Sequence, residues 1–141
     1  MKSEYTYLDI YNNPTELTEE EKNWFHKTCQ DCLKALGIKV PIYACQHELL
    51  KGKDKDALGL CWKLADSAAA APKEAYITID TYFIHECYDV RFHGADNILT
   101  ETLEEIIAHE AAHLTVWRHG KKHRELMAHY CDMINTAVGA F

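Results

Sequence analysis

The chain has 141 residues, of which 48% are apolar and 26% are charged, and its formal net charge is −7. This is material for one folded domain spanning residues 1–141, and no apolar run reaches the roughly 20 residues that cross a bilayer. The N-terminal residues lack the apolar core of a signal peptide, so we expect a soluble, cytoplasmic protein, and the negative charge disfavours nucleic acid as a partner.

The segment 18–36 is predicted to be the first helix. Thr18 stands three residues before Glu21, which is a capping-box pair, and apolar residues then recur at steps of three and four. Cys29 and Cys32 lie within this segment. We expect them to be small apolar residues on the buried face and, like the other four cysteines, free thiols, because nothing indicates export.

Three short segments rich in β-branched and aromatic residues follow, and we predict strands at 38–45, 57–64 and 75–83. Pro41 cannot donate a hydrogen bond to a neighbouring strand, so the first strand is expected at an edge of the sheet or at a bulge. An extended peptide can add to an exposed sheet edge, and we expect the strand at 75–81 to provide that edge.

The helical period returns at 100–120 and again at 122–138. Acidic residues crowd the start of the first of these two segments, as the helix dipole favours. Helices at both ends of the chain, with consecutive strands between them, predict an α+β fold with a small, mostly antiparallel sheet.

The chemistry is expected in the first of these helices, where residues 109–113 read HEAAH. Residues four apart project from the same side of a helix, so His109 and His113 can bind one metal ion. Glu110 lies about 100° around the helix axis, where it can act as general base on a metal-activated water. Imidazole ligands with one open position are typical of catalytic zinc, so Zn²⁺ is the expected cofactor.

A catalytic zinc site needs a third protein ligand. His119 is the first choice, at relative position 11 of the motif, provided that the chain leaves the helix near Trp117 and folds back, for which Gly120 supplies the backbone freedom. His123 is the alternative, and Glu125 and Asp132 are weaker candidates. Metzincins have the same 1-5-11 spacing but carry Gly at relative position 8, where this chain has Val116.

The segment HEAAHLTVWRHGKKHRELM resembles the active-site segment of SprT-like zinc metallopeptidases and their YgjP-type relatives. The resemblance covers roughly residues 17–135 and is strongest at 109–127. It implies a minimal zincin-like domain with a hairpin before the active-site helix. It also implies His109, His113 and His119 as metal ligands, Glu110 as the catalytic acid and base, and hydrolysis of peptide bonds in a protein or peptide substrate.

Two alternatives stay open at this point. The chain could be a metal-binding regulatory or adaptor module without turnover, or a zinc hydrolase that acts on a non-peptide substrate. Nothing in the spacing selects a donor for the oxyanion, for which the candidates are Tyr76, Tyr82, His85, Tyr88, Arg91 and His93. His85 and His93 are also candidates for a separate metal site.

Overall fold

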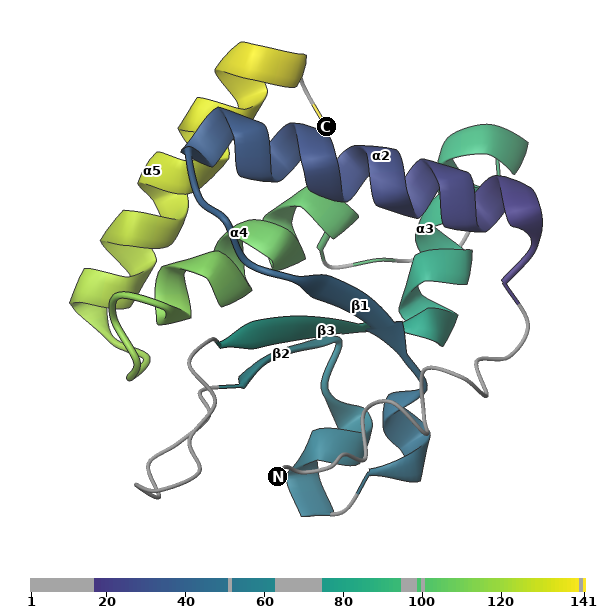
Figure 1. Ribbon diagram of the computed structural model, residues 1–141, viewed down its shortest axis with the longest axis horizontal. Coiled ribbons are helices and arrows are strands. Elements are labelled where there is room, and N and C mark those ends of the chain that lie inside the picture. Colours follow the sequence, from purple (N-terminus) through teal and green to yellow (C-terminus); the bar gives the residue numbers. More distant parts are fainter. Residues whose placement is uncertain (1–16, 51, 63–74, 95–98, 100, 140) are drawn as a thin grey trace.

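The computed structural model describes residues 17–50, 52–62, 75–94, 99, 101–139 and 141. The described α-helices and strands are α2 (Glu19–Leu36), β1 (Ile42–Cys45), β2 (Gly59–Trp62), β3 (Tyr76–Asp80), α3 (Thr81–His93), α4 (Leu103–His113) and α5 (Lys121–Val138). Two short 3-10 helices, η1 (His47–Leu49) and η2 (Gly52–Asp56), connect β1 to β2. The predicted α+β class is confirmed (Figure 1).

Helix α2 has the predicted capping box. The Thr18 hydroxyl accepts from the Glu21 backbone N–H at 3.1 Å, and the Glu21 carboxylate accepts from the Thr18 N–H at 2.8 Å. Cys29 and Cys32 are buried in the core as predicted, and all six cysteines are free.

The sheet has the strand order β1-β3-β2, with β1 parallel and β2 antiparallel to β3. The prediction that 75–81 forms a sheet edge is therefore wrong, because β3 is the central strand and has a neighbour on each side. Its buried run Tyr76–Ile79 fits that position, since a central strand is covered on both faces. The strand after Pro41 does lie at an edge, as predicted, and the sheet is mixed rather than mostly antiparallel.

The predicted strand at 75–83 ends early because Asp80 starts a helix. Its carboxylate accepts from the Phe83 backbone N–H at 3.2 Å and caps α3. The sequence analysis did not predict α3, whose first residues, Thr81 to Ile84, are β-branched or aromatic and favour strands.

The main core lies between the sheet and the helices. Ile77 and Ile79 of β3 are fully buried there with Ile107 and Ala111 of α4. In Figure 1, α2 and α4 cover this face of the sheet, and η1 and η2 lie toward the other face. Within the described residues, no helix is long and apolar enough to cross a membrane.

Candidate metal centre

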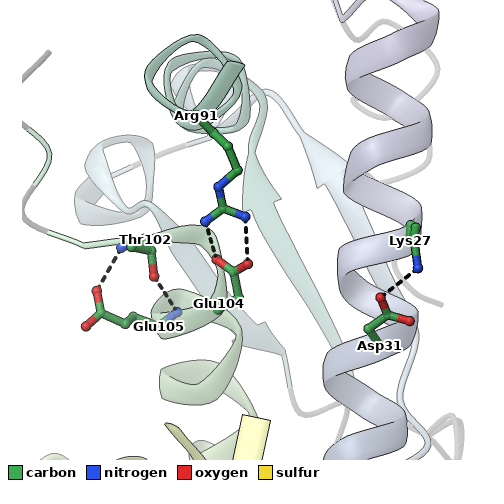
Figure 2. A network of polar contacts seen from close by, with 6 residues as sticks. All are labelled: Lys27, Asp31, Arg91, Thr102, Glu104 and Glu105. Atoms are coloured by element: carbon green, nitrogen blue, oxygen red, sulfur yellow. Dashed lines mark hydrogen bonds and ion pairs between the residues drawn. The ribbon is translucent and has the colours of Figure 1, made fainter. Parts of the chain in front are cut away.

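Helix α4 carries the HEAAH segment and is shorter than predicted. It begins with a second capping box (Figure 2). The Glu105 carboxylate accepts from the Thr102 backbone N–H at 2.8 Å, and the Thr102 hydroxyl accepts from the Glu105 backbone N–H at 3.1 Å. It ends at His113, and the backbone then turns through Leu114 before α5 begins. The two motif histidines therefore occupy the last turn of α4, next to an irregular loop.

That loop brings His119 back to the motif. The Nε2 atom of His119 lies 3.1 Å from Nε2 of His109 and 3.0 Å from Nε2 of His113. The next residue, Gly120, has φ 155° and ψ −166°, a conformation that is essentially restricted to glycine. The predicted fold-back of the chain at this glycine is confirmed.

The two Nε2–Nε2 distances are compatible with nitrogens that share one metal ion. Zinc–nitrogen bonds of about 2.0–2.1 Å in a tetrahedron place ligand nitrogens about 3.3–3.4 Å apart, close to the two separations seen here. The Nδ1 of His113 lies 3.2 Å from the carbonyl oxygen of Val116, to which it donates. A neutral His113 then presents a lone pair at Nε2, which is what a metal ligand requires.

His123 joins the same cluster in a different way. Its side chain is buried, its ring stacks on that of His113 with centroids 4.1 Å apart, and its Nε2 donates to the carbonyl oxygen of His109 at 3.0 Å. All four imidazoles offer a nitrogen within 4.8 Å of one another. Because His119 is the residue whose Nε2 meets both motif histidines, the geometry favours it over His123 as third ligand.

The weaker candidates lie elsewhere. Neither Glu125 nor Asp132 belongs to this four-histidine cluster among the described residues. Glu125 is exposed and lies 4.0 Å from Lys121 on the surface of α5.

Two imidazoles of the cluster, those of His109 and His113, have lowered pKa values. Burial first, and then the neighbouring His123, His113 and His119, together lower the pKa of His109 to about 4. Burial likewise lowers the pKa of His113. The carboxylate of Glu110, 3.9 Å from Nε2 of His109, does not reverse the downward shift at His109.

Glu110 lies beside the three nitrogens. Its side chain is 7% exposed, and its Oε2 is 3.9 Å from Nε2 of His109. Burial, followed by the charge of Glu101, raises the pKa of Glu110 to about 8. A carboxyl group in this environment binds a proton more readily than one in water.

Gly59 of β2 is a site residue that the sequence analysis missed. A Cβ atom at this position would lie 2.6 Å from Cγ2 of Ile106 and 3.0 Å from Cγ of Glu110. The absence of a side chain therefore lets the start of β2 contact the helix turn that carries Glu110. A glycine inside a predicted strand is a recognisable signal for such an approach.

The structure does not bring the predicted oxyanion candidates of α3 to this centre. Helix α3 lies at the far end of the molecule from the α4–α5 loop (Figure 1). Figure 2 shows that Arg91 forms a bidentate ion pair with the buried Glu104, with N–O distances of 3.0 and 3.3 Å.

His85 forms a second cluster, with Glu21 and Asp89. Its Nδ1 lies 2.5 Å from Oε2 of Glu21, and its Nε2 lies 3.4 Å from Oδ2 of Asp89. The ligand-type atoms are close enough for a metal ion, but the two ring nitrogens face different carboxylates. His93 reaches only Asp89, at 3.6 Å. His85 therefore links α2 to α3 through its contacts with acidic residues, and among the described residues His93 does not join it in a candidate metal site.

Comparisons with protein-family models, with curated proteins and with solved structures give no match.

Proposed function

We propose that the chain is a zinc-dependent metallopeptidase of the HExxH type, with His109, His113 and His119 as metal ligands and Glu110 as general base. The observation that carries the proposal is the convergence of three Nε2 atoms next to a buried carboxylate that is not one of them. The resemblance of this segment to SprT-like metallopeptidases supports the same assignment.

The residues have separate tasks in this proposal. Zinc, when bound, would polarise the scissile carbonyl and acidify a water molecule. Glu110 would take the proton from the attacking water and later deliver it to the leaving amine. The low exposure of Glu110 supports this role, because burial makes its carboxylate a stronger base than one in water.

The strand next to Glu110 supports a peptide as the substrate. Among the described strands β2 lies at an edge of the sheet, and its first residue, Gly59, contacts the base. A substrate segment that added to β2 in extended form would run past Glu110. The edge strand β2, rather than the central strand β3, is therefore the expected docking edge for an extended peptide.

The proposal is tested with Glu110→Gln and a matched surface control, Glu125→Gln. We expect Glu110→Gln to keep its zinc and to lose hydrolysis of a denatured protein substrate by about 10²- to 10⁴-fold, because a base is removed and no ligand is. Glu125→Gln should match the wild type. Full activity in Glu110→Gln, or no hydrolysis by the zinc-loaded wild type, contradicts the proposal.

His123 favours a second candidate, a metal-binding regulatory module without turnover. A fourth imidazole stacked on His113 offers a nitrogen near the three Nε2 atoms. Structural zinc sites fill all four positions with protein ligands, whereas catalytic sites keep one open. The number of imidazoles on the bound ion therefore separates the two candidates.

A further inference from the structure

A small polar cluster lies on the face of the sheet opposite the main core. The side chains of His47 from η1 and Thr78 from β3 are both fully buried. The Nε2 of His47 lies 2.8 Å from the Thr78 hydroxyl, which also accepts from the indole N–H of Trp62 at 3.0 Å. The other nitrogen of His47, Nδ1, lies 2.6 Å from the carbonyl oxygen of Ala57.

These bonds determine where the proton of His47 resides. A carbonyl oxygen can only accept, so Nδ1 carries the hydrogen and donates to Ala57. Burial lowers the pKa of His47, so the ring is neutral and Nε2 accepts from the Thr78 hydroxyl. One tautomer thus satisfies every polar atom of the cluster, which fixes the ring and the backbone that it holds.

The backbone that His47 holds leads directly to Glu110. Ala57 is bonded by His47, and the next carbonyl, that of Leu58, accepts from the Asp80 backbone N–H at 2.9 Å. The following residue is Gly59, whose Cα faces Cγ of Glu110 without room for a Cβ. Trp62, at the other end of β2, is tied to the same Thr78 hydroxyl. The Thr78 hydroxyl and the His47 imidazole therefore hold both ends of β2 in place.

We propose that His47 and Thr78 are positioning residues for Glu110: they fix β2 so that Gly59 supports the carboxylate beside the three-histidine centre. The inference rests on the proposed function for its effect on turnover, but its structural part is independent of it. Neither residue touches the imidazole cluster, so their loss should move Glu110 and leave metal binding unchanged.

The test uses Thr78→Val, which keeps the shape of the side chain and removes the hydroxyl, and Thr78→Ser, which restores it. Thr28→Val is the matched control, because Thr28 is also buried but lies on α2, far along the chain from β2. His47→Gln is a second variant that tests the cluster if Thr78→Val does not fold.

The activity-independent readout is the carboxyl ¹³C signal of Glu110, assigned by its absence in Glu110→Gln and recorded at fixed pH. We expect this signal to shift in Thr78→Val and in His47→Gln, to return in Thr78→Ser, and to stay unchanged in Thr28→Val. An unshifted Glu110 signal in a folded Thr78→Val or His47→Gln chain overturns the inference.

Turnover provides the second readout. We expect Thr78→Val to lower kcat about 10- to 100-fold with an unchanged zinc content, as small displacements of a catalytic group do. A shifted signal with unchanged kcat in an active enzyme overturns the positioning role. If the wild type does not hydrolyse protein at all, the proposed function fails, whereas the ¹³C comparison still decides whether His47 and Thr78 hold Glu110.

Discussion

Two clusters in this molecule use the same residue types in opposite ways. Around His109 four imidazoles gather, with the carboxylate of Glu110 3.9 Å from Nε2 of His109, and burial and the neighbouring rings lower the pKa of His109. Around His85 a single imidazole lies between Glu21 and Asp89, and the bond to Glu21 raises its pKa. The first environment disfavours a proton on His109, whereas the second favours a proton on His85.

The difference shows why histidine and carboxylate content alone does not identify a metal site. Both clusters place ligand-type atoms within 4.8 Å of one another. Among the described residues, three Nε2 atoms converge in the cluster around His109, whereas in the other cluster the two nitrogens of one ring contact different carboxylates. The two clusters therefore differ in the direction of the histidine pKa shift, which is downward at His109 and upward at His85.

The largest expected effect separates the roles of His119 and His123. His119→Ala should reduce zinc from about one ion per chain to none, because two imidazoles do not hold the ion. His123→Ala should lower zinc affinity about 10- to 100-fold without abolishing binding, since it removes a bond that orients α4. Competition titration with a chelator measures both, and His129→Ala on the exposed face of α5 is the control. The reverse ranking would make His123 the ligand.

A smaller effect is expected at Gly59. In Gly59→Ala the new Cβ would overlap Ile106 and crowd Glu110, so we expect a loss of about 1–3 kcal/mol in the free energy of unfolding. Hydrolysis should fall as well, with zinc content unchanged. Denaturant titration and metal analysis measure these quantities, and a variant as stable and active as the wild type would show that β2 does not support the base.

The pH dependence of stability tests the cluster around His109 in the zinc-free chain. An unfolded histidine binds a proton below a pKa of about 6.5, whereas the folded His109 does so only near 4. The free energy of unfolding should therefore fall by up to about 3 kcal/mol, through His109, as the pH falls from 6.5 to 4. The raised pKa of Glu110 changes stability with pH in the opposite sense. The two chains to compare are therefore the single variant Glu110→Gln and the double variant that also carries His109→Gln. An identical pH profile for both chains would contradict the account.

The smallest effect is expected at the other cluster. Since the folded pKa of His85 is raised, its stabilising contribution is present below the unfolded pKa and is lost as pH rises through the folded value. His85→Gln should flatten that part of the stability profile and leave zinc content and hydrolysis unchanged. Loss of a bound metal ion in this variant would instead make Glu21, His85 and Asp89 a ligand set.

Local patterns predicted the helical part of the site well. Helix periodicity and a four-residue spacing were enough for His109 and His113, and Gly120 indicated the turn that returns His119. The start of α3 was wrongly predicted as strand from its β-branched and aromatic residues. The Asp80 side chain caps the helix and outweighs the β propensity of the residues after it. The roles of Gly59 and of His47 depend on contacts between segments far apart in the chain, and no local period carries that information.

The central claim is that three imidazoles hold one zinc ion and leave a position open beside Glu110. X-ray absorption spectroscopy of the zinc-loaded chain tests it most directly, because it counts the imidazole and oxygen ligands of the ion. The account predicts three nitrogen ligands from imidazole and at least one oxygen from water, at about 2.0–2.2 Å. Four imidazoles on the ion, or a chain that binds no zinc, would contradict it.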